Sequence, residues 1–128
     1  MEKENMLTRA EWSVMECLWA KPGCTGREAI DELAETVGWT KSTTLTMLRR
    51  MTEKGIVRCD ETGEVRSYYP LVSREDAAMR ETDDFLGRVY SGSVGLMMSA
   101  MTQKQKLTRN EIDELYAILK KAEEDGNG

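Results

Sequence analysis

The sequence contains no histidine among its 128 residues. This absence excludes imidazole metal ligands and removes the side chain that most often performs acid–base catalysis near neutral pH. Carboxylates are plentiful, but they are scattered at the spacing of helix surfaces and form no catalytic pair. We therefore expect a protein that is not an enzyme and that holds no metal ion or other cofactor.

Cysteine is also scarce. The three thiols, Cys17, Cys24 and Cys59, are an odd number and include no C-x-x-C pair. This pattern is typical of reduced thiols rather than of a disulfide framework or a zinc site. We expect Cys17 and Cys59 to be partly buried.

Long apolar runs are missing as well. No stretch approaches the roughly 20 residues that a membrane-spanning helix requires, and the N-terminal MEKENMLTRAEW lacks the hydrophobic region of a signal peptide. The hydrophobic content of 40% and the charged content of 32% are typical of a globular chain. We expect a cytoplasmic protein without membrane insertion.

Positive charge is in deficit, because 18 lysines and arginines face 23 aspartates and glutamates, for a net charge of −5. Such a chain is a poor generic binder of polyanions. The charge is unevenly distributed, however. Residues 41–66 contain six basic and four acidic residues, a balance of +2, which leaves −7 for the remainder. A locally basic segment on an acidic body suits a sequence-specific DNA binder that does not coat DNA indiscriminately.

Four sites have a hydroxyl residue followed three positions later by a carboxylate. Thr8, Thr25 and Thr108 begin T-x-x-E capping boxes, and Ser73 begins a looser version ending at Asp76. In such a box the hydroxyl and the carboxylate each accept a free backbone N–H of the first turn. With the apolar spacing, these boxes predict helices over about 8–20, 25–37, 74–90 and 109–123. The core positions expected in the first two helices are Trp12, Met15, Leu18, Trp19, Ile30, Leu33 and Val37.

Residues 40–72 are the most informative segment. Periodicity predicts a helix over 41–54 that Gly55 ends. Its expected core stripe is Thr44, Met47, Leu48 and Met51. The opposite face is rich in hydroxyls and cations, and no acidic residue lies between Lys41 and Met51. Such a face suits phosphate oxygens and base edges in a DNA major groove, although a solvated surface helix can also lack acidic residues.

A hairpin is expected directly after this helix. Residues 56–60 and 66–71 alternate as strands do, and residues 61–64 supply the turn. We also expect a short third strand at Cys24. Three helices followed by a hairpin predict a winged helix-turn-helix, in a fold that is mainly α with a small β wing (α+β). We assign residues 1–72 to a winged-helix DNA-binding domain and residues 73–128 to a helical dimerisation region.

The C-terminal segment needs an apolar partner. Residues 74–123 form two or three amphipathic helices, separated by glycines and too short to build a core of their own. The nearest partner is the same segment of a second copy, so we expect a homodimer; a fold-back onto the winged domain is the alternative. The expected interface residues are Phe85, Leu86, Val89, Leu115, Ile118 and Leu119.

Four segments together resemble the penicillinase-repressor family. They are LTRAEWSVMECLW, TKSTTLTMLRRMTEKGIV, GEVRSYYPLVSRED and ELYAIL, within a likeness that covers about residues 6–121. The A-E-W-x-V-M-x-x-L-W helix combined with a Y-Y-P-L-V-S wing exit is more specific than winged-helix topology alone. The resemblance implies a dimeric transcriptional repressor whose winged helices bind the two halves of a double-stranded operator dyad.

The resemblance and the phase of the helix together assign the DNA contacts. Thr25 and Arg27, at the start of the second helix, are expected to hold a phosphate. Leu45 stands where relatives carry a long polar residue, so the operator sequence is expected to differ. The full set of expected DNA-binding residues is Thr25, Arg27, Lys41, Ser42, Thr43, Leu45, Thr46, Arg49, Arg50, Arg58 and Arg66.

The resemblance also bears on induction. In the antibiotic-responsive branch of the family, a membrane sensor-protease triggers cleavage at an Asn-Phe pair in the dimerisation region. That pair falls on Ala100-Met101 here, a departure that puts this route in doubt. The copper branch ends in paired C-x-C motifs, and this chain has no cysteine after Cys59.

Two other functions stay open. One is a winged helix that contacts only proteins, which the overall acidity would favour. The other is a repressor that releases DNA on binding a small-molecule inducer between its C-terminal helices. Met97, Met98 and Met101 could line such a pocket, although a methionine stripe is more often core or interface.

Overall fold

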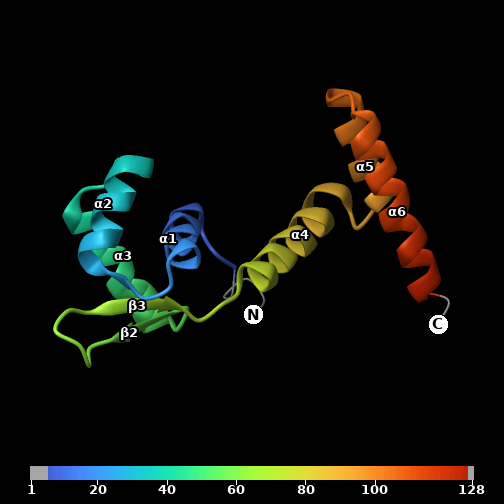
Figure 1. Ribbon diagram of the computed structural model, residues 1–128. Helices are drawn as coiled ribbons and strands as arrows, with labels where there is room; N and C mark the ends of the chain where they lie inside the picture. Colours follow the sequence, from blue (N-terminus) through green and yellow to red (C-terminus); the bar gives the residue numbers. More distant parts are fainter. Residues whose placement is uncertain (1–5, 127–128) are drawn as a thin grey trace. The chain divides into compact units, whose positions relative to one another are not determined.

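The computed structural model describes residues 6–126 (Figure 1). The elements in chain order are α1 (Arg9–Ala20), β1 (Cys24–Thr25), α2 (Gly26–Val37), α3 (Lys41–Lys54), β2 (Val57–Asp60), β3 (Ser67–Pro70), α4 (Arg74–Tyr90), α5 (Val94–Lys104) and α6 (Arg109–Gly126). The mainly helical fold with a small antiparallel wing is as predicted. The chain divides between Asp83 and Asp84, inside α4, into a winged unit and a C-terminal helical unit.

The predicted capping boxes set the helix starts. At Thr8 the Oγ1 atom accepts from the backbone N–H of Glu11 at 3.1 Å, and Glu11 accepts from the backbone N–H of Thr8 at 2.9 Å. The same reciprocal bonds form at Thr25 and at Thr108. At Ser73 the described residues form only one of the two hydrogen bonds of a capping box, in which Ser73 Oγ accepts from the backbone N–H of Asp76 at 3.0 Å. The last helix was predicted to end at about residue 123, but α6 continues to Gly126.

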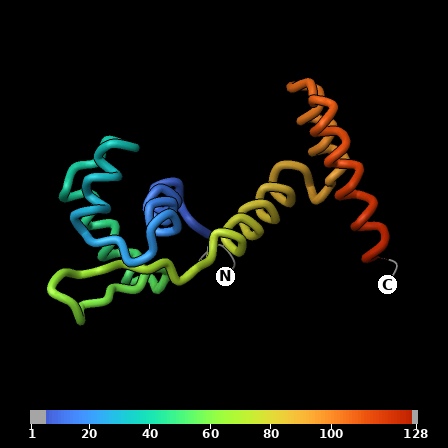
Figure 2. The backbone as a smooth tube through the Cα atoms, in the orientation of Figure 1, coloured from blue at the N-terminus to red at the C-terminus, as the bar shows by residue number. Residues whose placement is uncertain are grey.

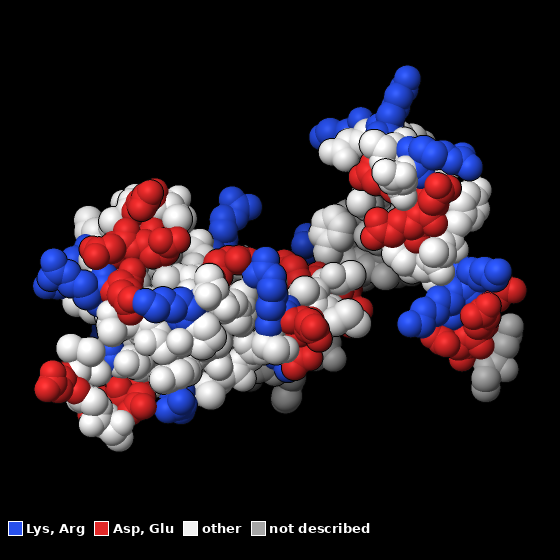
Figure 3. All heavy atoms as spheres, in the orientation of Figure 1, with Lys and Arg blue, Asp and Glu red and all other residues white. Residues whose placement is uncertain are grey.

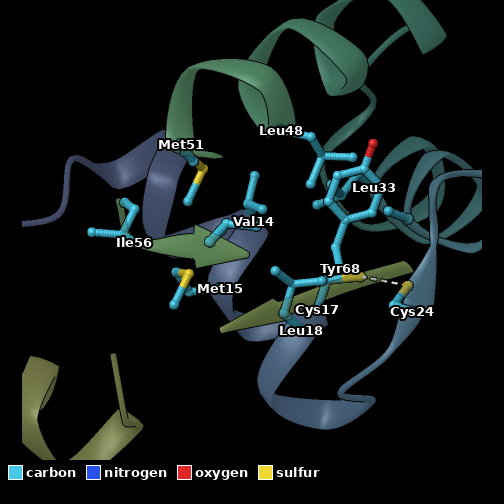
Figure 4. Close-up of a cluster of buried hydrophobic side chains, with 12 residues drawn as sticks. Val14, Met15, Cys17, Leu18, Cys24, Leu33, Leu48, Met51, Ile56 and Tyr68 are labelled. Carbon is cyan, nitrogen blue, oxygen red and sulfur yellow. Dashed lines mark hydrogen bonds between the residues drawn. The ribbon is translucent and has the colours of Figure 1, made fainter. Parts of the chain in front are cut away.

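The core of the winged unit lies between its three helices and the sheet (Figure 4). Its largest fully buried side chains are Met15, Leu18, Leu33, Leu48, Met51, Val14 and Val57. Five of these seven were predicted from helical spacing, and each buried side chain of this size contributes about 1.5–3 kcal/mol relative to leaving it exposed. The three helices are therefore fixed to one another and to the wing.

Other predicted core positions lie at the edge of the core. Val37 is 42% exposed, so that prediction is wrong. Trp12 and Trp19 are only half-buried; their rings pack edge to face with centroids 5.4 Å apart. Their indole N–H groups donate outward, to Glu16 at 3.0 Å and to the carbonyl oxygen of Val72 at 2.8 Å. Ile30 and Met47, which were also predicted as core positions, are half-buried.

The sheet has the strand order β1-β3-β2, and both pairings are antiparallel. The predicted short strand at Cys24 is confirmed, with Cys24 opposite Tyr68. Gly23 has a φ of +84°, and a Cβ at this position would lie 3.0 Å from the hydroxyl of Tyr69, so glycine is required there. The smooth trace in Figure 2 follows α3 into the hairpin and on into α4.

One ion pair joins α1 to the end of α3. Lys54 Nζ donates to both carboxylate oxygens of Glu11, at 3.1 and 3.0 Å. Glu11 is 8% exposed and also closes the capping box of α1. The carboxylate therefore stabilises the start of α1 and fixes the C-terminal end of α3 at the same time.

A buried hydroxyl on α3 leads to a stability prediction. Thr44 is fully buried, and its Oγ1 atom has no hydrogen-bond partner among the described residues. Thr44→Val removes this unsatisfied group while keeping the side chain's shape, so it should raise the free energy of unfolding by about 1 kcal/mol. Urea denaturation measures the change. Thr46→Val, at a half-buried position on the same helix, is the matched control and should change stability by less than about 0.5 kcal/mol. A loss of stability in Thr44→Val would contradict the prediction.

The C-terminal helical unit has almost no interior of its own. The single-chain structure buries no residue of α5 or α6. Phe85, Val89, Ile118 and Leu119 are 40–63% exposed, and Leu86 and Leu115 are half-buried. None of the helices within residues 6–126 is long and apolar enough to cross a bilayer. The unit therefore leaves a large apolar surface exposed to water.

Candidate nucleic-acid interface

The exposed face of α3 is the one that the sequence predicted. Thr44 and Leu48 are fully buried, which confirms the phase of the helix. Leu45 is 40% exposed and Thr46 is half-buried. The other predicted α3 residues are all exposed, and they are Lys41, Ser42, Thr43, Arg49 and Arg50. The core thus holds α3 with its hydroxyls and cations facing water.

A groove of about 680 Å³ runs between the start of α2, α3 and the hairpin. Its lining residues are Thr25, Gly26, Arg27, Ile30, Asp31, Lys41, Leu45, Val65, Arg66 and Tyr68. Five residues of the predicted set, separated by up to 41 positions in the sequence, therefore lie around one groove. Thr25 caps α2 here, so the positive end of that helix faces the groove.

A second groove, of about 420 Å³, adjoins the first on the other side of Leu45. Its lining includes Thr46 and Arg49 from α3 and Glu61 from the hairpin. Leu45, Arg66 and Tyr68 border both grooves. We call the two grooves together with the exposed residues of α3 the α3–wing surface. It presents short hydroxyls, one exposed leucine and several cations.

Two cations of this surface are held by neighbouring carboxylates. Arg49 pairs with Glu53 at 3.3 Å and Arg66 with Glu61 at 3.0 Å, and all four side chains are more than 60% exposed. Exposed pairs of this kind contribute only about 0–1 kcal/mol, so another anion can replace the carboxylate at little cost. On the face of the winged unit drawn in Figure 3, acidic and basic side chains are interspersed, which limits non-specific attraction of polyanions.

Tyr68 and Val65 are groove residues that the sequence did not indicate. Burial raises the pKa of the Tyr68 phenol above its ordinary value, so the hydroxyl stays neutral and can both donate and accept. In Figure 4 its ring points from β3 towards the helices. Val65 is 61% exposed near the tip of the wing. The adjacent Tyr69 faces the other side of the sheet, and only the strand register distinguishes the two tyrosines.

The structure does not bring every predicted residue to the grooves. The guanidinium of Arg58 lies 4.3 Å from the centroid of the Tyr69 ring and borders neither groove. Ser42, Thr43 and Arg50 are exposed on α3 but outside the groove linings. At the wing turn, Asp60 accepts from the N–H and hydroxyl of Thr62, at 2.9 and 2.6 Å, and these bonds hold the Asp60 pKa below its ordinary value.

Sequence comparison finds relatives along nearly the whole chain. The family model for the penicillinase repressor matches residues 7–121. The penicillinase repressor of Bacillus licheniformis is 33% identical over 119 residues, which cover 93% of this chain and 93% of that protein. The methicillin resistance regulatory protein MecI of Staphylococcus aureus strain N315 is 29% identical over 115 residues, covering 90% and 94% respectively.

Structural comparison finds two solved structures of the repressor BlaI. The solution structure of the monomeric form of Bacillus licheniformis BlaI in complex with the blaP half-operator matches with a TM-score of 0.51 at 32% identity, over 56% of this chain and 87% of that one. The DNA-binding domain of the repressor BlaI matches with a TM-score of 0.51 at 33% identity, over 59% and 93%. Because the family model and these relatives match its segments and its winged unit, the chain belongs to the penicillinase repressor family.

Proposed function

We propose that this protein is a transcriptional repressor that binds double-stranded operator DNA through its α3–wing surface and acts as a homodimer on a dyad operator. The observation that carries the proposal is the exposed polar face of α3, bordered by a groove whose lining includes Arg27, Lys41 and Arg66. The family consists of transcriptional repressors rather than enzymes, and a relative has been solved with a half-operator. Such a repressor works in the cytoplasm, where the chromosome lies.

Base readout is assigned to the exposed face of α3. Thr43 and Thr46 offer short hydroxyls that can donate to or accept from base edges, and Leu45 can contact a thymine methyl group. Arg49 has the length to reach a guanine edge or a phosphate once it leaves Glu53. Lys41 and Ser42 lie at the start of α3, where they suit contacts with the DNA phosphate backbone near the N-terminus of the helix.

Phosphate contacts are assigned to the borders of the same surface. Thr25 and Arg27 combine the free N–H groups of the α2 start with a cation. Arg50 lies on the exposed side of α3, and Arg66 lies on the wing next to α3. Arg58 contributes less, because its guanidinium is stacked on Tyr69. Phosphate contacts of this kind fix the position of the protein on the duplex without reading its sequence.

Dimerisation is assigned to the C-terminal helical unit. Its interface residues are those predicted from the sequence, namely Phe85, Leu86, Val89, Leu115, Ile118 and Leu119. The support is that four of the six are exposed and the other two half-buried, while α5 and α6 bury no residue. Such an apolar surface is unfavourable in water and is removed when two copies pair. Proteolysis or a ligand at this unit would then release DNA without touching the α3–wing surface.

A sensor-protease acting at Ala100-Met101 would have to reach a helical bond. The pair lies inside α5, where Ala100 is half-buried and Met101 is 55% exposed. Cleavage therefore requires local unwinding of the helix. The competing induction route is a ligand beside the half-buried Met97 and Met98. Both routes act on the unit to which we assign dimerisation.

The proposal is tested by two substitutions on α3. Leu45→Ala and Thr46→Ala should each weaken binding to DNA from the protein's own promoter region by about 1–3 kcal/mol, because a true base contact is worth that much. Each should also relax base preference at one operator position. Fluorescence anisotropy with a set of single-base operator variants measures both effects.

The matched control is Thr36→Ala, an exposed threonine on α2 outside both grooves. It should leave affinity and preference unchanged. If the α3 substitutions behave like this control, α3 does not read the operator. A wild-type protein that shows no salt-dependent binding to its promoter would favour the alternative of a winged helix that contacts only proteins.

A further inference from the structure

The first turn of α4 is held against α1 by three side chains. Glu16 Oε1 accepts from Arg74 at 2.5 Å, and the Arg74 guanidinium lies 5.3 Å from the centroid of the Trp19 ring. The Trp19 indole N–H donates at 2.8 Å to the carbonyl oxygen of Val72, two residues before α4 begins. Glu16 is itself held in place, because the same oxygen accepts from Trp12 Nε1 at 3.0 Å. We call Glu16, Trp19 and Arg74 the α4 anchor.

The link between the wing and α4 is short and well bonded. Residues 71–73 are all that separates β3 from α4. The backbone N–H of Leu71 donates to the carbonyl oxygen of Ile56 at 2.9 Å, and Ser73 caps the helix. Ala77, in the first turn of α4, is 5% exposed. The start of α4 therefore has a defined place on the winged unit.

The α4 anchor is better suited to orienting a helix than to stabilising a core. The side chains of Arg74 and Glu16 are 56% and 44% exposed, and ion pairs with such exposure contribute little to folding stability. Their contacts are directional, however, because a charge-assisted hydrogen bond and a cation–π contact each favour one distance and angle. What the anchor can fix is the direction in which α4 leaves the winged unit.

That direction matters when two copies bind one operator. α4 is a single helix from Arg74 to Tyr90, and the boundary between the two units falls within it, after Asp83. In a dimer on a dyad, the separation of the two reading helices has to match the half-site spacing. Each inserted base pair moves one half-site by about 3.4 Å along the DNA axis and turns it by about 34°.

We propose that the α4 anchor restricts the dimer to one half-site spacing. This inference rests on the proposed function, a homodimer on a dyad operator. Glu16, Trp19 and Arg74 lie outside the linings of both grooves, so they act as positioning residues and not as DNA contacts. Without the anchor, α4 leaves the winged unit in a range of directions, and the dimer then accepts several spacings.

The test measures binding of the full-length protein to duplexes in which the half-site spacing is changed one base pair at a time. Each duplex contains two copies of the half-site from the protein's own promoter region, and anisotropy titrations give the affinity. For the wild type, a change of two base pairs from the best spacing should remove most of the avidity of about 10²–10⁴-fold. For Arg74→Ala, and separately for Trp19→Phe, the same change should cost less than about tenfold. Both variants should bind an isolated half-site as tightly as the wild type.

Arg80→Ala is the matched control, because it removes an exposed arginine from the same helix outside the anchor. Its spacing profile should equal that of the wild type. If Trp19→Phe does not fold, Arg74→Ala decides, since the Arg74 side chain is exposed.

The outcomes separate this inference from the proposed function. A spacing profile as sharp in Arg74→Ala as in the wild type would overturn the role of the anchor and leave the dimeric repressor intact. Weaker binding of Arg74→Ala to the isolated half-site would also overturn it, because the anchor would then support the winged unit itself. A wild-type protein that binds two half-sites no better than one would refute the dimer, and this inference with it.

Discussion

A chain that ends at Asp83 is expected to sediment as a monomer and to bind a full dyad operator about 10²–10⁴-fold more weakly than the intact protein. The reason is avidity: two DNA-binding units joined in one dimer bind two half-sites with a high effective concentration for the second contact. Analytical ultracentrifugation and anisotropy titrations on the same operator measure the two effects.

The cut belongs after Asp83 because the start of α4 is part of the winged unit. Arg74 pairs with Glu16 at 2.5 Å and lies 5.3 Å from the centroid of the Trp19 ring. Ala77 is only 5% exposed. Removing these residues with the rest of α4 would remove packing from the domain that is to be tested.

The control for this prediction is an isolated half-site. The shortened and intact chains should bind it equally well, since one winged unit makes all the contacts. A full-length Ile118→Asp, Leu119→Asp variant should reproduce the shortened chain, because charges on both exposed positions oppose pairing of the helices. An intact chain that sediments as a monomer at tens of micromolar, and binds the dyad no better than the shortened one, would refute the dimer.

Combined replacement of Arg27, Arg50 and Arg66 by alanine is expected to weaken specific and non-specific DNA alike. Affinity falls as salt concentration rises, and each lost phosphate contact makes the slope of log K against log salt concentration less steep by about 0.9. The magnitude of the slope should therefore decrease by roughly three per chain. Titrations at four or five salt concentrations, on operator and on unrelated DNA, give both slopes.

Arg109→Ala is the matched control for the loss of charge. Arg109 lies at the start of α6 and its side chain is 82% exposed, so its removal should leave the slope nearly unchanged. A combined variant with the parental slope would show that the three arginines do not contact phosphate. Weakening confined to one DNA sequence would instead assign the responsible arginine to base recognition.

The features that the sequence predicted well are local. Each capping box closes within four residues, so Thr8, Thr25 and Thr108 mark helix starts without knowledge of the rest of the fold. The phase of α3 was also predictable, because a stripe of apolar residues around Thr44 leaves only one face for solvent. That face holds most of the candidate interface.

The features that were missed depend on tertiary structure. Val37 has the spacing of a core residue, but it is the last residue of α2 and lines an open pocket between α1 and α2, where it is 42% exposed. Whether Tyr68 or Tyr69 faces the core follows from the register of β3 with β1 and β2. Glu11 and Lys54 are 43 positions apart, and no local pattern connects them.

The cysteines show the same limit. Cys17 and Cys24 have none of the spacing of a known metal motif. They meet because the chain turns at Gly23 and returns to the sheet alongside α1. Burial raises the pKa of the Cys17 thiol to about 12, which keeps the sulfur protonated and unreactive.

Hydroxyl-radical footprinting of the intact protein on the DNA upstream of its own gene tests the proposed function most directly. A dimer that binds a dyad should protect two patches related by two-fold symmetry, with centres separated by one or more whole helical turns of about 10–10.5 base pairs. The protection should disappear when the base sequence of either half-site is scrambled. Protection that is uniform along the DNA, or that persists on the scrambled sequence, would contradict a sequence-specific dimeric repressor.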